Sequence, residues 1–398
     1  MKMPEEIDFL DLKTLEALSV HGPRNITHIA RKLGIPAETM RKRLKRLGSQ
    51  IFLKFHANIY HTSLGLKKAV VFAEAVPGHE DLLFHSFKMN DFWIFVSRYY
   101  GMVEGCAGIY TIPVDHEEEF QQFLEEVRKM EVAKDVRVFW STCFQAVHSK
   151  CNWYDPKSET WDFKWDEWIE EISTKEDELP QTLIDPEDWP MKAEEMDIFI
   201  LKELEKDATV SFTDLAKMLG VSPQLVRYHW QKHLIKRNLI ESFDVSVFHF
   251  GRAASDMFFF ILTFDTMEKL AQFALSLLDK PFVRTVGKIL GKKALYLHIY
   301  IPRSEFRKFI DSLSRLVRKG LLQRYWYAIQ DLEKSSRQTI SYEYFKGGQW
   351  IYDHKRHIEN LRELVKQTES INKQGDKKGL TRVTSQFLTL SKGLTEVH

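Results

Sequence analysis

Two short stretches of the 398-residue chain carry side chains that could recognise nucleic acid. Residues 24–46 contain eight Lys or Arg residues and one acid, Glu38. Ammonium and guanidinium groups bind phosphate without reading base sequence. Residues 224–232 contain Gln224 and Gln231, whose amides can each pair with adenine in a bidentate way. These residues predict DNA recognition, mainly electrostatic in the first stretch and base-specific in the second.

The apolar residues around the basic stretch predict helices that would position it. The expected buried faces are Ile26, Ile29, Ala30 and Leu33 in one helix, and Met40, Leu44 and Leu47 in the next. Gly34 separates these helices, and Pro36 opens the second at a position where its missing N–H costs nothing. With an amphipathic helix over residues 7–20 before them, they form a helix-turn-helix pattern. Residues 51–60 alternate in hydrophobicity and predict the two short strands of a wing.

The helical spacing also predicts which side chains face DNA. Met40, Leu44 and Leu47 point inward in the first stretch, and Val226 and Trp230 point inward in the second. The candidate DNA-binding residues are therefore Glu38, Thr39, Arg41, Lys42, Lys45 and Arg46, together with Gln224, Arg227, Tyr228, Gln231 and Lys232. The alternative interpretation is that these are ordinary solvated positions of two surface helices.

The two stretches belong to an internal repeat with a constant offset of 186 positions (216 − 30 = 186). The matched pairs are Asp11 with Asp197, Ala30 with Ala216, Leu33 with Leu219, Gly34 with Gly220, Arg41 with Arg227, and Gly65 with Gly251. A register kept without a gap from Asp11 to Gly65 predicts one module used twice.

Each helix-turn-helix is followed by a pattern in the order strand, helix, strand, strand, helix, strand. The expected elements are 67–76, 80–89, 92–100, 103–113, 117–130 and 136–142, then 257–264, 268–278, 283–289, 294–302, 305–319 and 324–330. This order is typical of a ferredoxin-like sheet with both helices on one face. Aromatic hairpins are expected at 153–168 and 342–352, and packing is favoured over stacking on single-stranded nucleic acid as their role.

The predicted fold class is α+β, with two winged helix-turn-helix domains that are each followed by a ferredoxin-like domain. The predicted domains are 1–62, 63–172 with the first aromatic hairpin, 191–248, 249–345, and 346–398 with a hairpin or helix and a mobile tail. Residues 173–190 are acidic and contain three prolines, which predicts an extended linker.

These residues resemble the Lrp/AsnC family of transcription regulators, in a tandem form. In the second copy the matching positions are Asp197–Ile198, Leu201, Leu204, Leu215–Ala216, Leu219–Ser222, Val226–Arg227, Leu239–Ile240 and Gly251. In the first copy they are Leu15, Leu18, Ile29–Ala30, Leu33–Ile35, Arg41, Leu44, Leu47 and Leu64–Gly65. The resemblance covers 8–142 and 194–330.

The resemblance implies a helix-turn-helix followed by an effector and dimerisation module, with double-stranded DNA as the partner. It also implies pairing through the ferredoxin-like modules, inside the chain and between chains. The family's Gly-x-x-Asp effector turn corresponds here to Gly101–Glu104 and Gly291–Ala294. The candidate effector residues are thus Gly101, Glu104 and Gly291, and the changed acids put amino-acid sensing in doubt.

Composition excludes several other classes. The formal net charge of +1 conceals a basic first stretch and an acidic segment over 166–188, which holds ten acids and could contact the basal transcription factors or polymerase. The three cysteines have no metal-ligand or disulfide spacing, so we expect no metal and a reducing cytoplasm. The longest apolar run, 257–264, is too short to span a membrane, which needs roughly 20 residues. We expect no cofactor and no catalytic residues, and hence no enzyme.

Two alternatives remain from the sequence. Siroheme decarboxylases look similar in fold and use His and Arg around a tetrapyrrole, for which His61, His148, His249 and His298 would be candidates. The other alternative is a protein-interaction module that has kept the helix-turn-helix shape and lost DNA binding.

Overall fold

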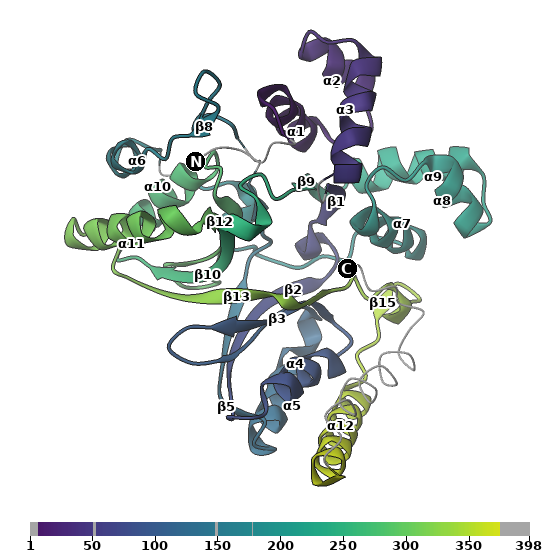
Figure 1. Cartoon of the computed structure of the whole chain (residues 1–398). Coiled ribbons are helices and arrows are strands. Elements are labelled where there is room, and N and C mark those ends of the chain that lie inside the picture. The colour runs from purple at the N-terminus through teal and green to yellow at the C-terminus, as the bar shows by residue number, and fades with distance from the viewer. Residues whose placement is uncertain (1–6, 51–52, 148–149, 177, 375–398) are drawn as a thin grey trace. The chain divides into compact units, whose positions relative to one another are not determined.

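The computed structural model describes residues 7–50, 53–147, 150–176 and 178–374 (Figure 1). The chain divides into two units, each made of segments that are distant in sequence. Unit 1 comprises Met1–Tyr60, Thr142–Pro186 and Glu203–Tyr327, and unit 2 comprises His61–Ser141, Glu187–Lys202 and Ala328–His398. Among the described helices, none is both long and apolar enough to cross a membrane.

Unit 1 contains the elements of both helix-turn-helix motifs. The first set is α1 (Phe9–His21), α2 (Ile26–Lys32), α3 (Ala37–Gln50) and β1 (Lys54–Ile59). The second set is α8 (Phe212–Leu219), α9 (Pro223–His229), the π-helix η5 (Trp230–Ile235) and β9 (Ile240–Ser246). They follow α7 (Glu195–Lys206), a helix that crosses the boundary between the units.

Local sequence explains where these helices begin. Asp8 caps α1, because its carboxylate accepts from the Asp11 amide at 2.8 Å while the Asp11 carboxylate accepts from the Asp8 amide at 3.0 Å. This reciprocal pair satisfies two amide donors that a helix start leaves without partners. Ser211 and Ser222 cap α8 and α9 in the same way through their hydroxyls, and Pro223 occupies the first turn of α9.

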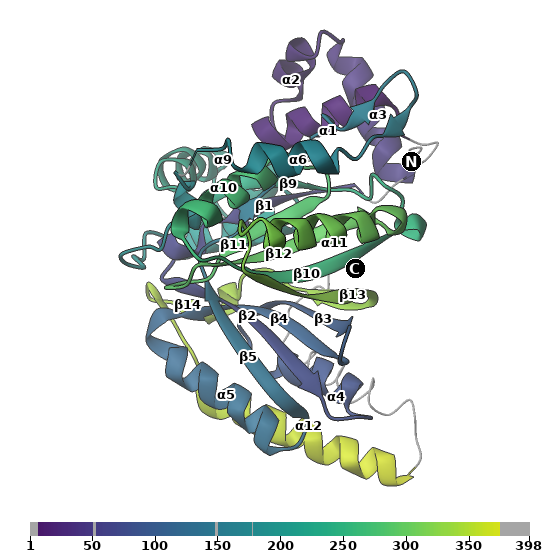
Figure 2. The same cartoon turned by 90° about the vertical axis from the view of Figure 1, so that its left-hand side faces the viewer.

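The sheet of unit 1 has a ferredoxin-like strand order. Its elements are β10 (Ser255–Thr263), α10 (Met267–Leu277), β11 (Val283–Lys288), β12 (Ala294–Pro302), α11 (Arg303–Arg318) and the start of β13 (Arg324–Arg337). The strand order is β13-β10-β12-β11, with the short β6 (Gln145–Ala146) added beside β11. Figure 2 shows α10 and α11 on the same face of these strands. The mixed helix-and-strand fold class predicted from the sequence is thereby confirmed.

The first aromatic segment completes the core of unit 1. It forms the hairpin β7 (Tyr154–Asp155) and β8 (Thr160–Trp161), followed by α6 (Trp165–Ile172). Trp168 is fully buried, and its ring lies 5.8 Å from those of Phe273 and Phe282 and 6.0 Å from that of Phe309. Its indole N–H donates to the Ser276 hydroxyl at 3.1 Å. These aromatic residues are therefore packing groups, in agreement with the favoured interpretation.

Unit 2 repeats the same element order. It contains β2 (Leu66–Ala75), α4 (Glu80–Ser86), β3 (Trp93–Tyr100), β4 (Gly105–Pro113), α5 (Glu117–Lys129) and β5 (Ala133–Ser141). The strand order is β5-β2-β4-β3, and the later part of β13 pairs with β3. Apolar residues of α4 and α5 pack on this sheet in one buried cluster that includes Val71, Tyr110 and Phe120.

The C-terminal aromatic segment packs on that cluster. It comprises β14 (Phe345–Lys346), β15 (Gln349–Trp350) and α12 (His354–Gln374). Tyr352, Ile358, Leu361 and Leu364 belong to the same buried cluster as the first ferredoxin-like core. Figure 2 shows α12 alongside α5.

Polar contacts fasten the start of α12. The Asp91 carboxylate accepts from His357 Nε2 at 2.8 Å and is also paired with the Arg356 guanidinium. Asn90 donates to the Tyr352 hydroxyl at 2.6 Å. Burial alone would raise the pKa of Asp91, but the hydrogen bond from His357 and the charge of Arg356 hold this pKa below its ordinary value.

Three predictions about organisation need correction or restriction. The two-stranded wing expected at 51–60 is wrong for the described residues 53–60, which form the single strand β1, and its partner is β9. The predicted limits 63–172 assign the first aromatic hairpin to the first ferredoxin-like domain, whereas it packs in unit 1 on residues of 249–327. Residues 371–374 of the expected mobile tail lie in α12, and 375–398 fall outside the described residues.

Candidate functional site

The first candidate reading surface is the solvent side of α3. Glu38, Arg41, Lys42 and Lys45 are exposed there, and Thr39 is half-buried. Arg41 Nη1 lies 3.6 Å from Glu38 Oε2, and both side chains are more than half exposed. An ion pair this exposed is worth little, so it does not prevent Arg41 from turning to a phosphate. The surface offers cations and little hydrogen-bonding specificity.

Arg46, predicted to face DNA, is directed elsewhere, and that prediction is corrected here. Its guanidinium forms a short ion pair with Asp11 of α1, whose side chain has no exposed area. Arg43 Nη1 binds the same carboxylate at 2.8 Å and Asp8 at 2.6 Å. A buried carboxylate is costly without such partners. Helical periodicity predicts the direction of a long side chain from the position of its Cα alone. The guanidinium of Arg46 instead reaches the buried carboxylate of Asp11.

The second candidate reading surface lies on α9 and the π-turn that continues it. Gln224, Arg227, Tyr228, Gln231 and Lys232 are all exposed, and Tyr228 keeps 52% of its surface. Their side chains combine amide, guanidinium, phenol and ammonium groups, which is the range of donors and acceptors that reads base edges in a major groove.

The buried face of that segment differs from the prediction. Val226, His229 and His233 are buried, while Trp230, expected to point inward, is half-buried. The helix changes from α to π at Trp230, but regular helical spacing from Val226 already brings positions 229 and 233 to the inward face. The two imidazole rings stand 4.4 Å apart between centroids.

Arg24, counted in the basic stretch, links the two motifs instead of extending a charged surface. Its guanidinium lies 4.7 Å from the centroid of the Phe212 ring and 4.5 Å from that of Trp230. It also donates to the Val210 carbonyl at 2.8 Å. Burial lowers the pKa of Arg24 to about 10. A guanidinium held between two rings and a carbonyl positions the turn before α2 against the second motif.

A two-stranded sheet fixes the same junction. β1 and β9 pair antiparallel, and Ala57 lies opposite Phe243. These residues are each other's counterparts in the predicted repeat, since 57 + 186 = 243. A contact in which equivalent positions face each other is the signature of a local two-fold axis. The two strands therefore pair at positions that the predicted repeat makes equivalent.

The candidate effector residues lie in two separate settings. In unit 2, Gly101 follows β3, and Glu104 Oε2 pairs with Arg98 Nη2 at 3.3 Å. In unit 1, Gly291 has a φ of +65°, and its amide donates to Asp185 Oδ2 at 3.1 Å. Asp185, a residue of the acidic linker, thus supplies the carboxylate bound at the second turn.

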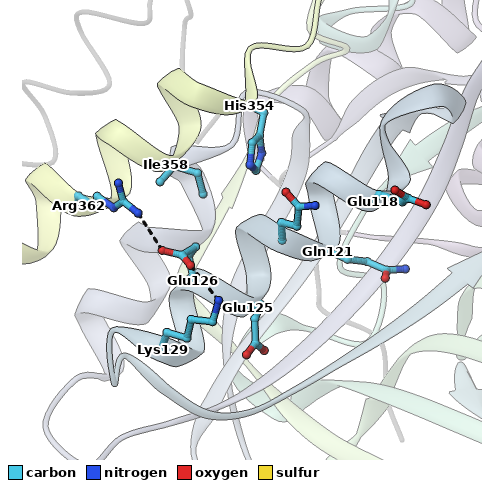
Figure 3. Close-up of a pocket in the computed structure, with 9 residues that line it drawn as sticks. Glu118, Gln121, Glu125, Glu126, Lys129, His354, Ile358 and Arg362 are labelled. Atoms are coloured by element: carbon cyan, nitrogen blue, oxygen red, sulfur yellow. Dashed lines mark hydrogen bonds and ion pairs between the residues drawn. The ribbon is translucent and has the colours of Figure 1, made fainter.

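A groove of about 810 Å³ lies between α5 and α12 in unit 2 (Figure 3). It is lined by Glu118, Gln121, Gln122, Glu125, Glu126, Lys129, His354, Ile358 and Arg362. Glu126 is paired with both Lys129 and Arg362 at 3.2 Å. Glu126 thus pairs with both cations of this lining, Lys129 and Arg362.

The histidines considered for tetrapyrrole binding are placed as follows. His61 is buried in unit 2, and His249 and His298 are buried in unit 1. His249 Nε2 contacts the Pro281 carbonyl at 3.0 Å, and burial lowers the pKa of His249 to about 3. His298 stacks on Phe259 at 5.1 Å. His148 lies outside the described residues.

Comparison with known protein families identifies the class of the second motif. An AsnC-type helix-turn-helix domain matches residues 194–232. The predicted resemblance to the Lrp/AsnC family is confirmed at this domain, and a domain of this type suggests a DNA-binding regulator. No curated protein matches the chain.

Solved structures of two kinds are similar in fold. The siroheme decarboxylase NirDL has a TM-score of 0.47 and 12% identity, covering 90% of this chain and 98% of that chain. Its complex with an iron-uroporphyrin III analogue gives 0.48 and 11%, covering 89% and 97%. AsnC of E. coli gives 0.26 and 18%, covering 34% of this chain and 91% of that chain.

These matches overturn one prediction. The sequence predicts that the chain is not an enzyme. The match to NirDL, a siroheme decarboxylase, covers 90% of this chain and contradicts that prediction. The absence of a recognised catalytic motif was therefore insufficient ground for the exclusion, and the statement that the chain is not an enzyme is withdrawn.

Proposed function

We propose that this chain is a transcription regulator that reads double-stranded DNA with two unlike recognition segments. The observation that carries this proposal is the exposed row of Gln224, Tyr228 and Gln231, which lies within the AsnC-type domain at 194–232. In a helix-turn-helix the second helix enters the major groove, and its exposed side chains reach base edges. Lys42 and Lys45 of α3 supply charge at the other recognition segment.

The proposed arrangement is one module used twice, with a helix-turn-helix at 1–62 and 191–248 and a ferredoxin-like part at 63–172 and 249–345. The pairing of Ala57 with Phe243 supports it, because the counterparts meet about a local two-fold axis. Two-fold related readers favour half-sites in inverted orientation. Because their exposed residues differ, we propose that the two half-sites differ in sequence. Further pairing of chains through the ferredoxin-like parts, a contact with the transcription machinery and a cytoplasmic location belong to the same proposal.

The experiment begins with selection of a bound sequence from random duplexes, followed by footprinting of the full chain. The expected site has two dissimilar halves separated by a helical turn or a multiple of it. Binding is then measured against salt for Lys42→Ala, Lys45→Ala and Gln231→Ala. Each Lys variant should flatten the slope of log affinity against log salt by about 1 and weaken all sequences alike. Gln231→Ala should relax discrimination at one position by about 1–3 kcal/mol.

Three results would contradict parts of this proposal. A perfect palindrome bound by a single chain would argue against unlike readers. Equal effects of the three substitutions on every sequence would argue against the division between charge and base reading. Failure to bind any duplex at low salt would leave a protein-interaction role. Titration with a tetrapyrrole, followed by its visible absorbance, tests the enzyme-like alternative on the same sample.

A further inference from the structure

His229 and His233 form a pair of imidazoles on the buried side of the second reading segment. They are four residues apart, with 6% and 5% of their surfaces exposed. Their ring centroids lie 4.4 Å apart, and the planes cross at 64°. Their ligand nitrogens lie within 4.8 Å of each other. Small rotations of the rings would bring these nitrogens to the separation that two ligands of one metal ion require.

Two imidazoles at positions i and i+4 are a recurrent metal-chelating arrangement on helices. Neutral imidazole nitrogen is a ligand that suits zinc, copper, iron and nickel.

We infer that His229 and His233 bind a divalent transition-metal ion of the zinc class. Two imidazoles supply two ligands, and water or further oxygen and nitrogen donors of the chain complete the coordination. The site stands on the histidine pair alone and does not depend on DNA binding.

The position of the histidine pair indicates that the bound ion also affects base discrimination, an inference that rests on the proposed function. The pair spans the junction where α9 ends at His229 and the π-helix η5 begins at Trp230. Residues 230–232 lie between the two ligands, and Gln231 and Lys232 among them are exposed. A π-turn is less stable than an α-turn and often marks a functional position. An ion that ties its two ends together fixes the direction of the Gln231 amide, so metal occupancy regulates base discrimination.

The test uses the full chain stripped of metal with a chelator and titrated with cobalt(II), whose visible absorption reports its ligands. One equivalent should bind and be displaced by zinc(II). His229→Gln and His233→Gln should each weaken cobalt binding by at least about tenfold, the lower limit seen when even supporting groups of metal sites are removed. His28→Gln, an exposed histidine of α2, is the matched control and should bind as the unaltered chain does.

His233→Cys distinguishes a lost ligand from a damaged fold. A thiolate is itself a zinc-class ligand, so this variant should keep cobalt and gain a sulfur-to-cobalt charge-transfer band. Unchanged cobalt binding in both glutamine variants, or no new band in the cysteine variant, would overturn the site.

The effect of the metal on base discrimination is measured separately. With metal removed, the preference that depends on Gln231 should fall at least tenfold, while affinity for non-specific duplex stays constant. If cobalt binds through the pair and base preference does not change, the site stands and the regulation is wrong. If no duplex binds under any condition, the proposed function fails and the cobalt spectra still decide the metal site.

Discussion

Asp11→Asn should loosen the first recognition helix without altering any side chain that faces DNA. The Asp11 carboxylate has no exposed area and binds Arg43 and Arg46 of α3. A hydrogen bond to a charged group contributes about 1.5–3 kcal/mol. Arg43 would keep Asp8 at 2.6 Å, the asparagine would keep one acceptor oxygen, and Arg46 is 36% exposed. The expected cost is therefore less than the sum for two such bonds, about 2–3 kcal/mol.

Hydrogen exchange read by mass spectrometry measures this cost locally, which suits a chain with two units that need not unfold together. A loss of 2–3 kcal/mol should speed exchange in α1 and α3 by roughly 30- to 150-fold, since about 1.4 kcal/mol is tenfold. Glu38→Gln is the control, because Glu38 is 67% exposed and its loss should cost less than about 0.5 kcal/mol.

Substitution of Arg46 tests the assignment of its guanidinium to Asp11. If Arg46 serves Asp11, Arg46→Ala should speed exchange in α1 and leave the salt slope of DNA binding near that of the unaltered chain. If Asp11→Asn leaves exchange unchanged while Arg46→Ala flattens the slope as much as Lys45→Ala, then Arg46 binds phosphate and the assignment to Asp11 is wrong.

Three further outcomes are expected. Arg24→Ala should loosen the link between the motifs by about 2 kcal/mol, and selections should then return sites with variable half-site spacing; unchanged spacing would contradict the link. Because the pKa of Asp91 is lowered in the fold, its contribution is present above the unfolded pKa of about 3.9 and lost as pH falls through the folded value. Proteolysis between β15 and α12 should therefore rise in acid, and Asp91→Asn should show this cleavage already at neutral pH. Trp168→Ala should cost about 3–5 kcal/mol and broaden fluorescence and exchange signals of unit 1, whereas Ile184→Ala at a 46% exposed position should cost less than about 0.5 kcal/mol.

The sequence predicts the helices and strands but not all of the contacts between them. Periodicity placed β12 at Ala294–Pro302 with the same limits as the structure, because each of its residues is buried and the run is bounded by turn residues. The same signal placed β1 but not its pairing with β9, since alternation says which face is buried and nothing about a partner 186 residues away. The aromatic segments were recognised as packing groups, yet no local pattern says which core a segment covers.

In the candidate site too, exposure within one helix could be predicted, whereas a contact between two helices could not. Exposure along α3 and most of α9 could be predicted from the buried stripe, which a regular helix fixes. The fate of Arg46 could not, because it depends on a buried acid in another helix. His229 and His233 were overlooked for a different reason. Their four-residue spacing is visible in the sequence, but spacing alone does not show that the two rings are buried side by side.

The packing of α12 on the first ferredoxin-like core sets an order of events on the ribosome. The cluster that holds Tyr110 and Phe120 is closed by Leu361 and Leu364, and Leu364 is translated 223 residues after β5 ends at Ser141 (364 − 141 = 223). At about 5–20 residues per second, the nascent sheet waits roughly 10–45 s with an apolar face uncovered. During that interval it is a substrate for chaperones. A cell that shortens the chain before α12 would meet an aggregating product even though every residue of the first sheet is present.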